Sequence, residues 1–276
     1  MSITAPLHSR STAPGRVAAT APAARPAGLI GTTLLHAKYA LIEIARTPMA
    51  LIGTMVFPAL ALLFFVVPNT AVGGNREYAT QAVISMAVFA IMSGCLFSFA
   101  LTVAENREKP WDPYLRTLPA PGAARVLAHV FSTGLLSIAS LLPVILIGAL
   151  FTAAEAPFWR VIVGVLAVAV GALPFMFLGT ALGHLLPMKA AIAVVQIVMF
   201  GFAFLGGLFL PPQMFPDWLE VASRYVPSRE AREFVIWAVQ GGTLPWWSWV
   251  GLAGWIVVTF VAAVLLFRRD EGRRFR

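Results

Sequence analysis

The chain has 276 residues, of which 59% are hydrophobic and 12% are charged, and its formal net charge is +8. Soluble domains carry about 25% charged residues, so this composition excludes an ordinary water-soluble protein. Apolar runs of about 20 residues, long enough to cross a bilayer core roughly 30 Å thick, recur along the chain and predict an all-α membrane protein.

The first 27 residues are rich in Ala, Pro, Ser and Thr, and they contain three arginines but no acidic residue. They lack the continuous apolar core of a secretory signal, so we expect a disordered cytoplasmic tail at 1–27. An organellar transit peptide has a similar composition and remains an alternative.

In the next segment, 28–47, polar side chains recur at intervals of three and four residues, as one face of a helix requires. These side chains belong to Thr32, His36, Tyr39, Glu43 and Arg46. The proline at position 48 predicts a break, because the residue before a proline avoids the helical region. We therefore expect an amphipathic connecting helix that lies in the membrane plane.

Six segments within 48–267 are long and apolar enough to be transmembrane helices. They are 48–67, 80–104, 126–153, 161–186, 190–210 and 246–267. Pro58, Pro143 and Pro174 lie inside three of these spans and predict kinks there.

Basic residues are distributed unevenly between the two sides of these spans. Fifteen of the 20 Lys and Arg residues precede the first span, lie in the 105–125 loop, follow the fourth span, or belong to the 268–276 tail. Since basic loops stay in the cytoplasm, we expect both termini there, in a multi-pass protein of the cell inner (plasma) membrane. This distribution accounts for the positive net charge without a nucleic-acid partner.

The segment 211–245, before the last span, is neither a span nor an ordinary loop. Asp217 is predicted to cap one short helix, and Pro227 with Ser228 is predicted to begin another. Aromatic residues suited to a membrane interface accompany them, namely Trp218, Tyr225, Trp237, Trp246 and Trp247. We expect two short, re-entrant helices on the outer face.

The spans are nearly free of ionisable groups. His129 and His184 lie near predicted cytoplasmic helix ends, where packing is the more common role of a histidine than proton relay. Ion-coupled carriers commonly use charged groups inside their spans. The pattern therefore disfavours such a carrier, although backbone-lined sodium sites remain open.

No phosphate-binding loop, zinc motif or serine nucleophile motif occurs in the sequence. We therefore expect no catalytic residues, no metal site and no cofactor bound by this chain. Uphill transport would then need a second polypeptide that hydrolyses ATP.

A few polar residues do occur within the apolar spans. Gln196 is the best candidate for lining a path, because its amide needs partners, and Met199 and Phe200 beside it form a soft apolar wall. Ser93 on the second span is a weaker candidate, since serines in spans usually bond to their own helix. Gly179 and Gly183, four residues apart, predict close packing between helices.

The loop 105–125, with the sequence ENREKPWDPYLRTLPAPGAAR, mixes charge, aromatic residues and prolines between two uncharged spans. Asp112 is predicted to cap a short helix that Pro113 begins and Pro119 ends. The positive-inside rule explains the arginines, but the interleaved aromatic and acidic residues are more typical of a surface that a protein partner grips.

The order of these parts resembles the permease subunits of type-2 ATP-binding-cassette (ABC-2) exporters. The stretch AENREKPWDPYLRTLPAP resembles the coupling helix of that family, and GLFLPPQMFPDWLEVASRYVP resembles its segment ahead of the last span. Lys109-Pro110-Trp111 departs from the Gly-Thr that members often have after the acidic residue.

The resemblance implies a dimeric permease, as a homo- or heterodimer, bound to two copies of a cytoplasmic ATPase that would bind ATP and Mg²⁺. Residues implied to contact the ATPase are Glu105, Arg107, Glu108, Asp112, Tyr114, Leu115, Arg116 and Pro119. The implied path lies along the second and fifth spans, and the implied cargo is a hydrophobic or amphipathic drug, antibiotic or lipid-like molecule. An ion-coupled carrier or channel, and a non-catalytic membrane scaffold, remain alternatives.

Overall fold

The structure is a computed structural model that describes residues 38–39, 42, 56–108 and 122–274. Within these residues the regular secondary structure is helical, as predicted. The predicted tail at 1–27 and residues 109–121 of the predicted 105–125 loop lie outside the described residues. So does nearly all of the predicted connecting helix, of which only Lys38, Tyr39 and Ile42 are described, each in helical conformation.

The described part of the first predicted span is an apolar helix over Val56–Val66. Its last turn is the π-helix η1 (Leu62–Val66), in which the amide of Val67 donates to the carbonyl of Leu62, five residues back, at 3.2 Å. The short helix α3 (Thr70–Gly73) follows. Among the described residues, five helices are long and apolar enough to cross a membrane, and the helix over Val56–Val66 is a shorter apolar one.

Helix α4 (Arg76–Glu108) is the centre of the bundle. It contacts α8 (Phe158–Leu185), α9 (Met188–Leu205), α7 (Leu141–Phe151) and α6 (Gly122–Ala139), and most of its apolar length is buried by them. Many of its buried residues are Ala, Ser and Gly, which allow neighbouring helices to approach on several sides.

The third predicted span is divided into α6 and α7 at Ser140. Pro143, in the first turn of α7, has no N–H for the carbonyl of Ala139, and its ring crowds that carbonyl. The break therefore confirms the predicted kink at Pro143. Pro174, by contrast, lies inside α8 without ending the helix.

The close packing predicted at Gly179 and Gly183 is confirmed. A Cβ atom at Gly179 would lie 2.9 Å from the carbonyl oxygen of Leu96, and one at Gly183 would lie 2.6 Å from that of Ala100. Glycine therefore lets α8 lie directly against the backbone of α4, and these two helices form the most extensive contact of the bundle.

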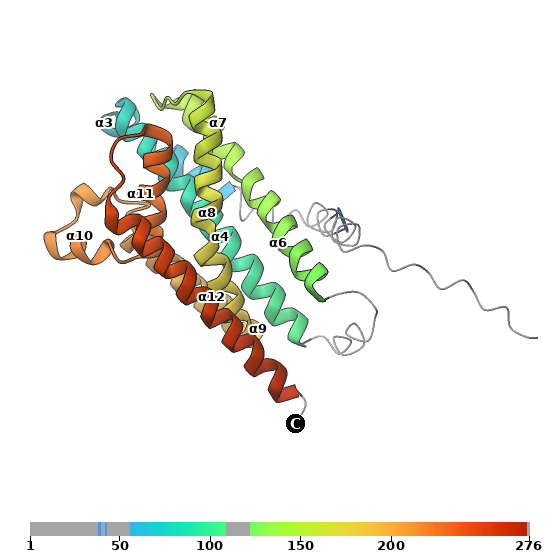
Figure 1. Cartoon of the computed structure of the whole chain (residues 1–276). Helices are drawn as coiled ribbons and strands as arrows, with labels where there is room; N and C mark the ends of the chain where they lie inside the picture. Colours follow the sequence, from blue (N-terminus) through green and yellow to red (C-terminus); the bar gives the residue numbers. More distant parts are fainter. Residues whose placement is uncertain (1–37, 40–41, 43–55, 109–121, 275–276) are drawn as a thin grey trace, which may run out of the picture.

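Two short helices precede the last span, as predicted: α10 (Asp217–Ser223) and α11 (Pro227–Gln240). The predicted capping role of Asp217 is wrong, because Pro216 occupies the N-cap position and no side chain caps the helix. Figure 1 shows α10 protruding from the side of the bundle, whereas α11 packs against α4, α8 and α12 (Trp246–Arg274). The bundle thus has an end carrying α3, called here the α3 end, and an opposite end where α4 and α12 finish.

Candidate functional site

The best-defined polar site at the end opposite α3 is centred on Arg107, in the last turn of α4. Its guanidinium donates two parallel hydrogen bonds to the carboxylate of Asp270 on α12, at 3.0 Å and 2.9 Å. Nη1 donates to the carbonyls of Gly183 at 2.9 Å and Leu186 at 3.3 Å. Bidentate pairs of this kind are among the stronger hydrogen bonds in proteins.

The position of these carbonyls explains why an arginine fits here. Gly183 and Leu186 lie at the end of α8, where the last carbonyls of a helix have no partner within it. A cation at that end also meets the negative end of the helix dipole. Arg107 therefore satisfies the end of α8 while it holds α12.

Glu108 makes the corresponding contact at the N-terminus of the next helix, α9. Its Oε1 accepts a hydrogen bond of 2.8 Å from the amide of Met188, the first residue of α9. A carboxylate at a helix N-terminus is favoured by the dipole and by the unpaired amides there. Consecutive residues at the end of α4 thus stabilise both sides of the turn between α8 and α9.

These contacts define the Arg107 junction: Arg107, Glu108, Gly183, Leu186, Met188 and Asp270. His184 adjoins it, with Nδ1 3.6 Å from the carboxylate of Asp270 and its ring edge-on to Phe267. The junction joins α4, α8, α9 and α12 at the point where α4 leads into the 109–121 loop.

Three of the predicted ATPase-contacting residues are described, and two of them belong to the junction. Arg107 and Glu108 are engaged within the chain, while Glu105 is exposed on the preceding turn of α4. The other five predicted contacts, Asp112, Tyr114, Leu115, Arg116 and Pro119, lie outside the described residues.

The predicted path residues do not all share one environment. Ser93 is buried and donates to the carbonyl of Ala90 on its own helix at 3.0 Å. On α9, Met199 is buried, but Gln196 lies on the exposed face. Phe200 is half-buried and packs edge-on to Phe57 at 6.4 Å. Met199 therefore belongs to the core of the single chain, and Gln196 does not.

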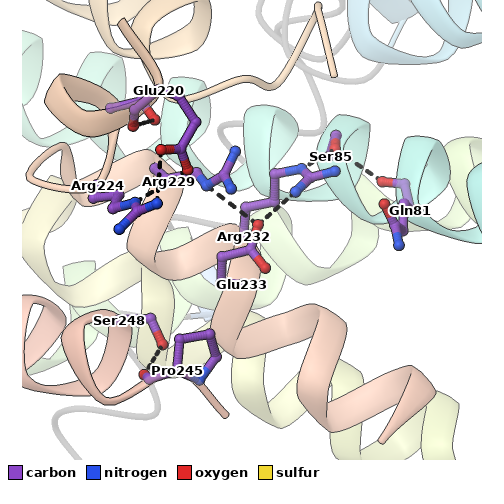
Figure 2. A network of polar contacts seen from close by, with 10 residues as sticks. Gln81, Ser85, Glu220, Arg224, Arg229, Arg232, Glu233, Pro245 and Ser248 are labelled. Carbon is purple, nitrogen blue, oxygen red and sulfur yellow. Dashed lines mark hydrogen bonds and ion pairs between the residues drawn. The ribbon is translucent and has the colours of Figure 1, made fainter. Parts of the chain in front are cut away.

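A second polar region, absent from the predictions, lies where α11 enters the bundle (Figure 2). It comprises Ser85 on α4 together with Arg229, Arg232 and Glu233 on α11, to which we add the buried Glu230 of the same helix, and is called here the α11 cluster. Arg232 is 3% exposed, and its Nε donates to the hydroxyl of Ser85 at 2.8 Å. Its Nη1 donates to Oε1 of Glu233 at 2.6 Å.

Arg229 makes the second ion pair of the cluster. Its Nε lies 3.2 Å from the same carboxylate oxygen of Glu233, which Figure 2 shows between the two arginines. The guanidinium also lies 5.9 Å from the ring centre of Trp247, a contact that favours a cation over an aromatic face.

Glu230 is 2% exposed and fills space left by a glycine on α12. A Cβ atom at Gly251 would lie 1.9 Å from its Oε1. Burial raises the pKa of Glu230 to about 8, because a carboxylate loses its hydration there. Burial also lowers the pKa of Arg232 to about 10, against the opposing effect of Glu233.

The spans themselves are nearly free of ionisable groups, as predicted, but α11 brings buried charged residues in among them. The spacing of Arg229 and Glu233, four residues apart just after Pro227, was the available signal, since such a pair neutralises itself on one helix face. Neutralisation lets a helix too short to span the membrane pack inside the bundle.

Among the described residues, no group of three His, Cys, Asp or Glu side chains is placed to hold a metal ion.

Comparison with known protein families gives a match over residues 66–265 to the family described as ABC-2 family transporter protein. The chain belongs to this ABC-2 family. The match covers α4 to most of α12, including Arg107 and the α11 cluster, and confirms the family resemblance read from the sequence.

A curated relative of this ABC-2 permease is the Bacillus subtilis (strain 168) protein named "Putative transport permease YvfS". The two are 24% identical over 231 residues, which is 83% of this chain and 94% of the relative. Asp270 lies beyond the residues that the family match covers, so the α12 side of the Arg107 junction is an observation from the structure alone.

Proposed function

We propose that this ABC-2 permease is the membrane-spanning subunit of an ATP-driven exporter, and that a separate cytoplasmic ATPase acts on its 109–121 loop. The carrying observation is the Arg107 junction. Because the loop follows α4 directly at this point, a displacement of the loop acts at once on the ends of α8, α9 and α12.

In this proposal the ATPase binds ATP and Mg²⁺, and this chain hydrolyses nothing. Two permease copies pair with two ATPase copies, each ATPase contacting one loop through residues such as Asp112, Tyr114 and Arg116. Both termini and the Arg107 junction face the cytoplasm, and the complex lies in the cell inner (plasma) membrane. The cargo is hydrophobic or amphipathic, as the resemblance to ABC-2 exporters implies.

The α11 cluster supports a second candidate function, an ion-coupled carrier. A buried carboxyl group with a raised pKa, such as that of Glu230, is a feature that proton-coupled transport uses. Family membership favours the ATP-driven reading, since ABC-2 permeases are subunits of ATP-binding-cassette transporters.

Reconstitution separates the two functions. Inside-out liposomes would contain either the permease alone or the permease with the ATPase that co-purifies with it, and uptake of a fluorescent hydrophobic cation would be followed. We expect accumulation only with ATPase, ATP and Mg²⁺, and no accumulation on an imposed pH or sodium gradient. Uphill transport by the permease alone on either gradient would refute the ATP-driven proposal and establish the carrier.

The variant Arg116→Glu tests the loop within the same assay. We expect loss of ATP-dependent uptake and of permease-stimulated ATP hydrolysis, with normal membrane insertion. The variant Arg160→Glu, at the opposite end of the bundle, is the matched control for an added negative charge. Equal behaviour of the two variants would remove the loop from the coupling role.

A further inference from the structure

A cavity of about 710 Å³ lies at the α3 end, between α4, α7, α8 and α11. This volume is within the range of small-molecule sites in proteins. The cavity is separate from the predicted path residues: none of Ser93, Gln196, Met199 and Phe200 lines it.

The walls of this cavity are almost wholly aliphatic. Its deep part is formed by buried side chains from all four helices, namely Ile84, Ala87, Leu141, Val168 and Val235. None of these side chains has a polar atom to satisfy, so the interior matches a hydrocarbon chain and gives a polar ligand group nothing to bind.

Two close helix contacts border the space. A Cβ atom at Gly148 of α7 would lie 2.5 Å from a methyl group of Val83, and one at Gly164 of α8 would lie 2.5 Å from a methyl group of Val239. The helices therefore touch at these glycines, while the space between them stays open.

The mouth of the cavity, by contrast, is polar and carries both signs of charge. Arg76 and Glu155 form an ion pair there, with side chains 71% and 61% exposed. The loop that holds Glu155 is fixed in place: the amide of Glu155 donates to the hydroxyl of Thr80 at 3.2 Å, and the amide of Ala153 donates to the carbonyl of Gly73 at 2.8 Å. The mouth is thus a built feature with a cation beside an anion.

We propose that this cavity holds one acyl chain of a zwitterionic phospholipid from the leaflet at the α3 end. The chain fills the aliphatic interior, the lipid phosphate lies against the guanidinium of Arg76, and the lipid ammonium lies against the carboxylate of Glu155. Charge complementarity selects this occupant, because a zwitterionic headgroup presents an anion and a cation side by side and can replace the Arg76–Glu155 contact with two new ones.

This inference does not depend on the exporter proposal. The lipid is a resident of the permease, held whether or not ATP is hydrolysed, and it fixes the spacing of α7 and α11 against α4. If ATP-dependent transport failed, the proposal of a bound lipid would be unaffected. If the lipid were absent, the exporter proposal would be unaffected.

The test is photolabelling of the full-length permease in nanodiscs made of phosphatidylethanolamine. The probe is phosphatidylethanolamine with a diazirine near the methyl end of one acyl chain, and labelled residues are mapped by mass spectrometry. We expect labels on the interior positions Ile84, Leu141 and Val168. Labels spread evenly over lipid-facing positions such as Leu142 and Leu166, with none inside, would overturn the proposal.

Variants that fill the cavity test whether the interior labelling comes from lipid bound inside it. Ala149→Trp at the mouth and Val165→Trp on the α8 wall would fill the space, and each is expected to reduce interior labelling at least about fivefold. Leu150→Trp, which adds the same ring at an exposed position of α7 that does not line the cavity, should leave labelling unchanged. Undiminished interior labelling in both plugged variants would also overturn the proposal.

Competition by unlabelled lipid tests the headgroup. Because ion pairs at an exposed mouth are weak, phosphatidylethanolamine should compete only about two- to fivefold better than phosphatidylglycerol, which lacks the ammonium. Glu155→Gln should abolish that preference while interior labelling persists. Equal competition by the two lipids in the unmodified chain, or labelling by a drug-like hydrophobic probe but not by the lipid, would refute the phospholipid assignment.

Discussion

The Arg107 junction and the α11 cluster both pair arginine with carboxylate, but they are built in opposite ways. The junction joins residues far apart in sequence, Arg107 and Asp270, near the surface at one end of the bundle. The cluster pairs residues one and four positions apart on a single helix, Arg232 or Arg229 with Glu233, and it buries both arginines while Glu233 is half-buried. Long-range pairing connects helices, whereas local pairing neutralises a helix so that it can be buried.

The largest expected effect follows from breaking the buried cluster. Glu233→Leu would leave Arg229 and Arg232 buried without their carboxylate, and removing one partner of a buried pair typically costs about 3–5 kcal/mol. We expect a strongly lowered melting temperature in detergent, measured by size-exclusion chromatography after heating.

The matched control is Glu220→Leu, which breaks the pair with Arg224 at 2.7 Å. This pair has the same four-residue spacing but lies at a partly exposed site, where such pairs contribute about 0.3–0.5 kcal/mol. Equal melting temperatures for the two variants would show that burial does not distinguish the cluster.

The next largest loss of stability is expected at the close contact between α8 and α4 beside the Arg107 junction. Gly183→Ala places a Cβ atom 2.6 Å from the backbone oxygen of Ala100, which cannot move without shifting α4. We expect a loss of roughly 1–3 kcal/mol, as for other overpacked sites, together with weaker ATPase stimulation. Gly254→Ala on α12 is the control, since a Cβ atom there meets nothing within 4 Å.

A double-mutant cycle on Arg107→Ala and Asp270→Ala measures how strongly the long-range pair of the junction is coupled. We expect a coupling energy of about 1–3 kcal/mol for thermal stability, typical of charge-assisted hydrogen bonds between groups that are not fully exposed. Each single variant should also reduce ATP-dependent transport. Additive effects on stability would mean that the two helices are not joined through this pair.

The last prediction concerns the dependence of stability on pH. The folded-state pKa of Glu230 is raised from about 4.5 to about 8, so the folded chain holds this proton more tightly than the unfolded chain. Stability is therefore greatest below about pH 4.5 as far as this group is concerned, and it falls as the pH rises toward 8. Glu230→Gln should flatten the change in melting temperature between pH 5.5 and 8.5. An unchanged slope would show that the carboxyl group has its ordinary pKa.

Much of the helical layout could be predicted because it depends on local features. The apolar segments behind α4, α8, α9 and α12 were recognised within a few residues, since length and composition suffice to indicate a membrane-spanning helix. The break near Pro143 and the close packing at Gly179 and Gly183 were also predicted, because a missing amide proton or a missing Cβ atom acts wherever the helix is placed.

The sites were less accessible to such reasoning. Arg107 was expected to face the ATPase, and no sequence pattern indicates that the turn between α8 and α9 and the end of α12 come within hydrogen-bonding distance of it. Arg229 and Arg232 were counted as outer-loop charges, because residue type records charge but not whether a partner neutralises it.

The sequence by itself determined that this is a membrane protein, that its fold is helical and that it belongs to the ABC-2 family. The first two follow because hydrophobicity and backbone hydrogen bonding restrict a chain in lipid to few structures. Only the tertiary structure decided which charges are buried and which cavities remain. These depend on distances between helices far apart in sequence, such as that between Ser85 on α4 and Arg232 on α11, and such distances are fixed by packing alone.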